Sequence, residues 1–128
     1  MSYFYCKIVR TSFEDTVNRV TDLLKNEGFS VITDIDLKEK FKEKLNIDFK
    51  KYRILGACNP AFAHKAVVAE EKIGVMLPCN VLVIDKENGM TEVSAVDPVA
   101  SMMAVKNPAL APLASEIKEK LQKVVESI

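Results

Sequence analysis

VMLPCNVLVIDKENGMTEVSAVD, residues 75–97, is the stretch that indicates the fold most directly. Two runs rich in β-branched residues flank KENG, where Asn88 and Gly89 can supply the positive backbone angles of a tight turn. We therefore predict a β-hairpin here. The second run ends at Asp97-Pro98, in which Asp97 can cap a helix and Pro98 suits its first position. The second strand of the hairpin is thus expected to lead directly into a helix.

The same junction occurs earlier in the chain. YRILGACN, residues 52–59, predicts a strand. Residues 59–74 then predict a helix with Asn59 as its cap and Pro60 at its first position. Asn59-Pro60 and Asp97-Pro98 therefore each predict a strand-to-helix junction. LPCN, residues 77–80, lacks a following proline and needs another explanation.

The N-terminal segment predicts a strand that is packed mainly on one face. In YFYCKIVR, residues 3–10, the side chains of Phe4, Cys6 and Ile8 alternate with those of the residues between them. We interpret Cys6 as a core residue, because it alternates with two large apolar side chains.

Helical periodicity follows in several places. Ser12 can cap a helix whose apolar residues recur at helical spacing until Gly28 stops it. A strand over 29–37 precedes a short, heavily charged helix over 38–49 with a narrow apolar seam. A final helix with an apolar stripe begins at Pro112.

The predicted order is strand, helix, strand, short helix, strand, helix, strand, strand, helix. No repeated strand-helix-strand rhythm with glycine-rich phosphate turns occurs in the sequence. We therefore predict an α+β fold of two layers, a mostly antiparallel sheet with helices on it and short inserted helices. A doubly wound sheet is the alternative. Residues 1–128 contain no linker-like segment and are expected to form a single domain.

Charge and cysteine content argue against several classes of partner. Basic and acidic residues balance at 18 each and are interspersed, so we expect no nucleic-acid binding. Three cysteines are too few for a disulfide framework and favour reduced thiols in a cytoplasmic setting. The sequence has neither a signal-peptide core nor an apolar run long enough to span a bilayer, so we expect no membrane association.

The expected strand order brings several polar and sulfur-containing side chains to one rim of the sheet. If the second to fifth strands form an antiparallel meander, the third strand ends where the fourth begins and the fifth ends. Helix N-termini at this rim would attract anions and lower the pKa of nearby thiols. We therefore predict a ligand-binding rim formed by Cys58, Asn59, His64, Cys79, Asn80 and Asp97.

Several motifs together resemble a known family. They follow one another between about Ser12 and Met103: Gly28-Phe29, Ile35-Asp36, Tyr52-Arg53-Ile54-Leu55-Gly56-Ala57-Cys58-Asn59-Pro60, Leu77-Pro78-Cys79-Asn80 and Asp97-Pro98. In this pattern the chain resembles the conserved prokaryotic family catalogued as domain of unknown function 302. The resemblance implies a β-α-β(4)-α fold, similar to that of the TATA-box-binding protein, and a homodimer. It implies no particular activity, because the family has none assigned and a shared fold does not transfer function.

Three functions are compatible with these residues. The first is a small, dimeric cytoplasmic binding module whose rim holds a small anionic or metal-containing ligand. A metal site would use Cys58, Cys79 and His64, with Asp97 or a partner chain as a further ligand, because thiolate and imidazole suit zinc or copper. The second is a thiol-dependent redox protein or enzyme that uses the two cysteines, with His64 as proton acceptor. The third is a purely structural or interaction homodimer with VASMMAV, residues 99–105, at its interface. Catalytic residues and cofactors stay unknown at this stage.

Overall fold

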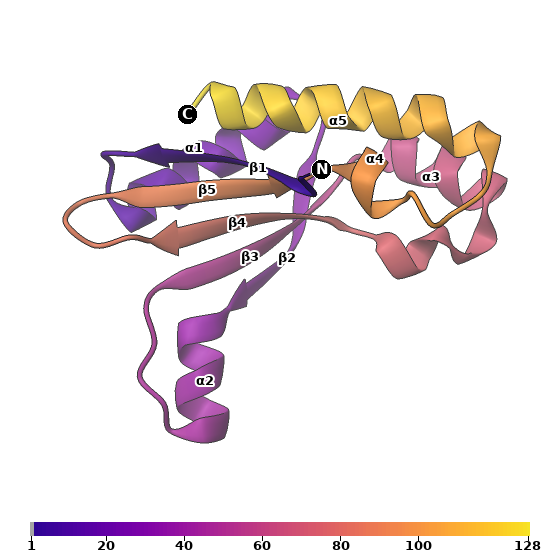
Figure 1. Cartoon of the computed structure of the whole chain (residues 1–128). Coiled ribbons are helices and arrows are strands. Elements are labelled where there is room, and N and C mark those ends of the chain that lie inside the picture. Colours follow the sequence, from indigo (N-terminus) through magenta and orange to yellow (C-terminus); the bar gives the residue numbers. More distant parts are fainter. Residues whose placement is uncertain (1) are drawn as a thin grey trace.

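The computed structural model describes residues 2–128 and places a five-stranded sheet beneath two long helices (Figure 1). The strands are β1 (Phe4–Val9), β2 (Ser30–Asp36), β3 (Tyr52–Cys58), β4 (Cys79–Asp85) and β5 (Thr91–Val96). The α-helices are α1 (Phe13–Asn26), α2 (Leu37–Leu45), α3 (Pro60–Ala69), α4 (Pro98–Ser101) and α5 (Ala111–Glu126). Two short 3-10 helices, η1 (Glu71–Met76) and η2 (Pro108–Leu110), connect them.

The sheet is antiparallel throughout, with the strand order β1-β5-β4-β3-β2. β2 to β5 form the predicted meander, and β1 pairs with β5 at one edge. α1 and α5 lie over one side of this sheet, whereas α2 extends from the other side (Figure 1). The predicted α+β class and the β-α-β(4)-α order are therefore confirmed.

Strand alternation gives the sheet two different faces. We call the side beneath α1 and α5 the covered face and the opposite side the open face. In β4, Val81 and Val83 are fully buried on the covered face, whereas Asn80 and Leu82 point to the open face. Buried apolar residues at helical spacing meet the covered face from above: Phe13, Val17, Val20, Leu24, Ile117, Leu121 and Val124.

Most predicted turns and helix ends are confirmed. Ser12 caps α1, because its hydroxyl accepts a hydrogen bond from the backbone N–H three residues later at 3.1 Å. Gly28, just beyond α1, has a φ of 85°, which favours glycine over residues with a side chain. In the hairpin turn, φ is 53° at Asn88 and 75° at Gly89, and Glu87 adopts a positive φ as well.

The prediction for β1 is wrong about which side is buried. Phe4, Cys6 and Ile8 lie on the open face, and Cys6 is exposed rather than a core residue. Tyr5 and Lys7 point to the covered face instead. The Lys7 ammonium donates hydrogen bonds of 3.0 and 2.9 Å to two backbone carbonyls at the C-terminal end of the chain. Tyr5 packs against the core on the same side, so this face of β1 is covered by partners that the strand's own pattern does not reveal.

The helix predicted for residues 59–74 is shorter than expected. α3 ends at Ala69, Glu70 is extended with a φ of −148°, and η1 follows. The side-chain amide of Asn107 donates a 2.9 Å hydrogen bond to the Ala69 carbonyl and a 3.2 Å hydrogen bond to the Glu70 carboxylate. A residue 38 positions away therefore satisfies the end of this helix.

Candidate functional site

The ends of β3, β4 and β5 meet at one rim of the sheet, as the meander requires. Ala57 pairs with Cys79, and Cys58 follows directly at the end of β3. The β4–β5 register, continued by two residues, places Asp97 opposite Cys79. The backbone therefore brings three of the candidate residues to neighbouring positions on this rim.

A pocket of about 180 Å³ opens at the rim between the sheet and α3. Three of the candidate residues, Cys58, Asn59 and Cys79, line it. Its other walls are apolar and come from four segments of the chain: Phe29, Ile32, Ala57, Phe62, Ala63, Leu77 and Pro78. A cavity of about 150 Å³ with an apolar lining can hold a molecule the size of benzene. The size and lining of the pocket therefore suit a small apolar ligand.

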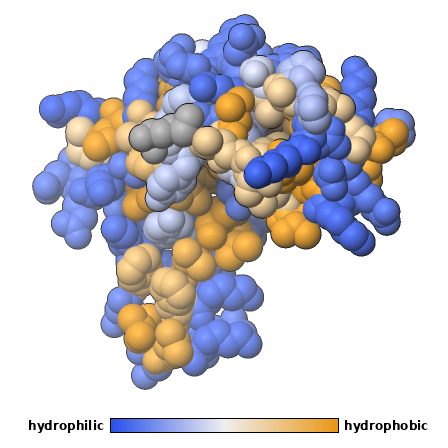
Figure 2. All heavy atoms as spheres, turned by 45° about the vertical axis from the view of Figure 1, so that its right-hand side comes forward, coloured by the Kyte–Doolittle hydropathy of each residue, from blue (hydrophilic) through white to orange (hydrophobic). Residues whose placement is uncertain are grey.

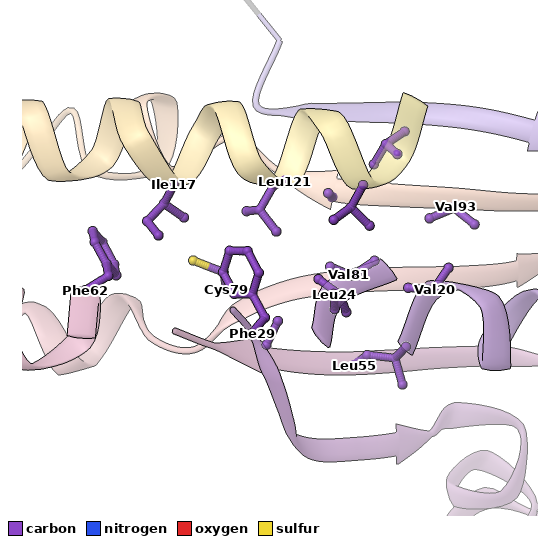
Figure 3. Close-up of a cluster of buried hydrophobic side chains, with 14 of the residues drawn as sticks. Val20, Leu24, Phe29, Leu55, Phe62, Cys79, Val81, Val93, Ile117 and Leu121 are labelled. Carbon is purple, nitrogen blue, oxygen red and sulfur yellow. The ribbon is translucent and has the colours of Figure 1, made fainter. Parts of the chain in front are cut away.

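Cys79 forms the buried wall of the pocket. It lies beside Phe29, and its sulfur points towards Phe62 beneath α5 (Figure 3), so that the residue is only 4% exposed. Burial, with a smaller contribution from the nearby Cys58, raises the pKa of the Cys79 thiol from 9.0 to about 11. The prediction that helix N-termini lower thiol pKa values is wrong for Cys79, because loss of water around the thiol disfavours the thiolate. This thiol is neutral at physiological pH.

Asn59 shapes the mouth of the pocket. Its side-chain oxygen accepts a 3.2 Å hydrogen bond from the Phe62 N–H, so it is the predicted cap of α3. This cap fixes the first turn of α3, from which Phe62 and Ala63 face the pocket. The amide nitrogen of Asn59 lies against Gly28, where a Cβ would be only 3.3 Å away. A glycine after α1 therefore leaves room for the cap of α3.

Gly56 and Pro78 form a contact that the sequence reasoning missed. A Cβ on Gly56 would collide with the Thr33 hydroxyl and would lie 2.7 Å from Cγ of Pro78. The missing side chain lets the proline ring lie on β3, and the next residue, Cys79, then enters the core. This contact explains LPCN. The glycine inside LGACN was the available signal, because a glycine in a strand interior often marks a close approach.

The other three candidate residues lie outside the pocket. Asp97 caps α4 with a 2.9 Å hydrogen bond from the Val99 N–H, and its carboxylate is 3.4 Å from the Lys118 ammonium. His64 is exposed on α3. Asn80 lines a separate hollow on the open face. The six predicted residues therefore do not form one shared pocket.

The metal hypothesis needs several ligands in one place. Within residues 2–128, no group of three or more His, Cys, Asp or Glu residues is arranged to hold a metal ion. His64, the imidazole of the proposed ligand set, is not on the pocket wall with the two cysteines.

Among residues 2–128, no helix is both long and apolar enough to cross a membrane.

Comparisons with known proteins point to one family. Domain of unknown function DUF302 matches residues 5–128. The crystal structure of an uncharacterized conserved DUF302 protein from Bacillus stearothermophilus is similar, with a TM-score of 0.90 and 31% sequence identity over 98% of each chain. No curated protein matches the chain. The family match and this structural likeness agree with the motifs quoted above, and the chain therefore belongs to the DUF302 family.

Proposed function

We propose that this protein is a binding module for a small, neutral and largely apolar ligand held in the pocket at the rim. The observation that carries the proposal is the lining of the 180 Å³ pocket, which is apolar apart from Cys58, Asn59 and the neutral Cys79 thiol. Burying apolar surface there is favourable by about 25 cal/mol per Å². Burying an unpaired charge in the same place is unfavourable. An aromatic ring or a short branched chain fits both conditions.

Cys58 and Asn59 supply the polar contacts of the proposed site. Both are half-buried at the pocket mouth, between the apolar interior and solvent. A few polar groups in an apolar pocket are the usual means of fixing the orientation of a ligand. We therefore place the apolar part of the ligand against Phe29 and Phe62, and its polar part beside Cys58 and Asn59.

This ligand class differs from the anionic or metal-containing ligand suggested by the sequence. The Asn59 side chain already occupies an N–H group at the start of α3. The protonated Cys79 thiol is a poor metal ligand, because metals bind the thiolate. The Asp97 carboxylate is engaged by α4 and Lys118. These features leave little attraction for an anion or a metal ion at the rim.

A thiol redox pair is the second candidate, supported by two free cysteines on one pocket. Standard strand spacing and rise place their Cα atoms about 6 Å apart, within the range of a disulfide. However, Ala57, which pairs with Cys79, directly precedes Cys58 in β3. Because successive residues of a strand point to opposite faces, the side chains of Cys58 and Cys79 leave the sheet on opposite faces. The raised pKa of Cys79 also disfavours the thiolate needed for exchange. Binding is therefore the better-supported function.

The location proposed for this binding module is the cytoplasm, because its three cysteines are free thiols.

Benzene titration followed by NMR tests the binding proposal. We expect saturable chemical-shift changes at the amides of Phe29, Cys58 and Phe62. Ala63→Leu adds three carbons to a side chain that lines the pocket and is expected to abolish these changes. Ala61→Leu, at an exposed position of the same helix, is the matched control and is expected to bind benzene like the wild-type protein.

Other outcomes would contradict the proposal. Absence of saturable shifts in the wild-type protein, or unchanged binding by Ala63→Leu, would exclude an apolar site here. Saturable shifts at the rim with zinc or inorganic phosphate but not with benzene would restore the ligand class suggested by the sequence. Rapid formation of a Cys58–Cys79 disulfide with oxidised glutathione, detected by mass spectrometry, would favour the redox function instead.

A further inference from the structure

Apolar residues are spread over several parts of the surface, from the body of the molecule to the projecting segment around α2 (Figure 2). Leu45 and Ile47 in that segment are 61% and 49% exposed. Exposed apolar side chains alone therefore do not identify one site. The pocket at the rim differs from these surfaces, because two free thiols and a side-chain amide line it together with apolar side chains.

Cys58 is the accessible thiol of this pocket. It is the last residue of β3, it is half-buried, and it forms no disulfide. α3 begins at Pro60, so Cys58 lies at the pocket mouth between the sheet and this helix. A thiol at such a position can release its proton to solvent and still contact a molecule in the pocket.

Cys79 is the second thiol, and its burial points to a ligand independently. It is 4% exposed, and no hydrogen bond among the residues that the structure describes engages its sulfur. The sulfur points towards Phe62, which lines the same pocket (Figure 3). A buried polar group without a partner marks a place where a bound molecule can supply one. Because its pKa is raised to about 11, Cys79 stays protonated at neutral pH and does not compete with Cys58 as a nucleophile.

Asn59 supplies hydrogen-bond donors next to Cys58. Its side-chain oxygen already accepts a 3.2 Å hydrogen bond from the Phe62 N–H. The side-chain nitrogen carries two N–H groups, for which a carbonyl oxygen is a suitable acceptor. Two consecutive residues on the pocket lining therefore offer a nucleophile and a donor for a carbonyl group.

We infer that the pocket captures small, neutral α,β-unsaturated carbonyl compounds by covalent addition to Cys58. This inference rests on the binding function proposed above and names the chemical class of the ligand. The apolar walls hold the carbon skeleton, and Asn59 donates a hydrogen bond to the carbonyl oxygen. The β-carbon, which is close to that oxygen in such a molecule, meets the sulfur of Cys58.

The reaction is an addition, so it needs no oxidant or reductant. Cys58 releases its proton to water, and its sulfur forms a bond to the β-carbon. The carbon–carbon π bond breaks, and the electron pair moves to the carbonyl oxygen, where the N–H groups of Asn59 stabilise the enolate. Water then donates a proton to the α-carbon. The product is a thioether that keeps the carbonyl group.

Mass spectrometry of the full chain treated with cyclohexenone at neutral pH tests the inference. We expect a single rapid adduct, at Cys58, whose rate of formation saturates with cyclohexenone concentration. Cys6 is exposed and does not line the pocket, so it is the internal control and is expected to react at least about tenfold more slowly. Benzene is expected to slow the reaction at Cys58 alone, because it competes for the pocket.

Variants separate occupation of the pocket from the addition step. Ala63→Leu fills part of the pocket and is expected to lower the rate at Cys58 to that at Cys6. Ala61→Leu, at an exposed position of α3, is the matched control and is expected to keep the wild-type rate. Asn59→Asp keeps a capping oxygen but loses the N–H donors, so we expect it to bind benzene and to lower the maximal rate at least about tenfold.

Two further measurements show that each variant is comparable with the wild-type protein. Circular dichroism establishes that the variant is folded. The rate at which iodoacetamide alkylates Cys58 shows that the thiol is still accessible and ionises as before. A loss of reaction with cyclohexenone at an unchanged iodoacetamide rate therefore reports the pocket or the carbonyl contact.

The outcomes distinguish this inference from the proposed binding function. Saturable benzene binding without faster reaction at Cys58 than at Cys6 would overturn covalent capture and leave the binding function standing. Absence of both benzene binding and the adduct would overturn both proposals. An adduct mainly at Cys79, an unchanged rate in Ala63→Leu, or a wild-type maximal rate in Asn59→Asp would overturn the inference as well.

Discussion

The covered face and the open face of the sheet are built from alternate residues of the same strands, yet they differ in how far their side chains are buried. Val81, Val83 and Val93 are fully buried beneath the helices, whereas Phe4 and Ile8 on the other side stay partly in solvent. Both faces carry large apolar side chains, so the presence of apolar residues alone does not distinguish them. The covered face stabilises the fold, whereas large apolar side chains of the open face stay partly exposed to solvent.

The largest contrast between the two faces is expected from truncating their apolar side chains. Leu121→Ala, at a fully buried position of α5, is expected to lower the free energy of unfolding by about 2–5 kcal/mol, because burial is lost and a cavity remains. Ile8→Ala on the open face is the counterpart and is expected to cost about 0.5 kcal/mol or less in the isolated chain. Urea denaturation under conditions that keep the protein monomeric measures both. Equal losses of unfolding free energy in the two variants would show that both faces contribute alike to the stability of the chain.

At the rim, burial of Cys79 is expected to make the free energy of unfolding depend on pH. Its pKa is raised from 9.0 to about 11 by burial, so the unfolded chain releases this proton at lower pH than the folded protein does. The free energy of unfolding is therefore expected to fall between about pH 9 and pH 11, by about 2–3 kcal/mol in total. Cys79→Ala removes this part of the slope while other groups still titrate. Identical slopes for both proteins would mean that solvent reaches the thiol.

Gly56 tests how closely the rim is packed. Gly56→Ala is expected to destabilise the protein by about 1–3 kcal/mol, because its Cβ meets Thr33 and the ring of Pro78. Gly74→Ala is the matched control, since nothing lies within 4 Å of a Cβ at that position. The control is expected to be neutral or slightly stabilising. Thermal unfolding of both variants measures the difference, and similar melting temperatures would show that Pro78 moves away without cost.

The smallest effect is expected at the cap of α3. Asn59→Ala removes the acceptor for the Phe62 N–H and is expected to cost about 1 kcal/mol in urea denaturation. Asn59→Asp keeps a side-chain oxygen at this position and is expected to retain most of that stability. An equal loss in both variants would assign the role of Asn59 to its amide nitrogen beside Gly28.

Local chemistry made much of the fold predictable. Ser12, Asn59 and Asp97 bind N–H groups only two or three residues away, so their capping roles depend on little else. Asn88 and Gly89 similarly specify the hairpin turn by their own backbone angles. Only β4 and β5 are joined by a tight turn, whereas the β2–β3 and β3–β4 connections contain α2 and α3. The strand order nevertheless confirms the predicted meander, in which successive strands are neighbours in the sheet.

Contacts between distant residues explain the predictions that failed. On the covered side of β1, Tyr5 packs against the core and Lys7 donates hydrogen bonds to carbonyls at the other end of the chain. The early end of α3 depends on Asn107. No local pattern announces such partners, because each donor meets its acceptor only after the sheet and α5 have come together.

For the candidate site, too, the positions of the residues were predictable from the sequence, whereas their chemistry was not. The sequence by itself determined that Cys58, Asn59 and Cys79 gather at one rim, because in an antiparallel pair the end of one strand lies beside the start of the next. Only the tertiary structure decided their chemistry. A thiol's pKa depends on the water and charge around it, and the segments that remove water from Cys79 come from far along the chain. The same packing lines the pocket beside Cys79 with apolar side chains from several segments of the chain.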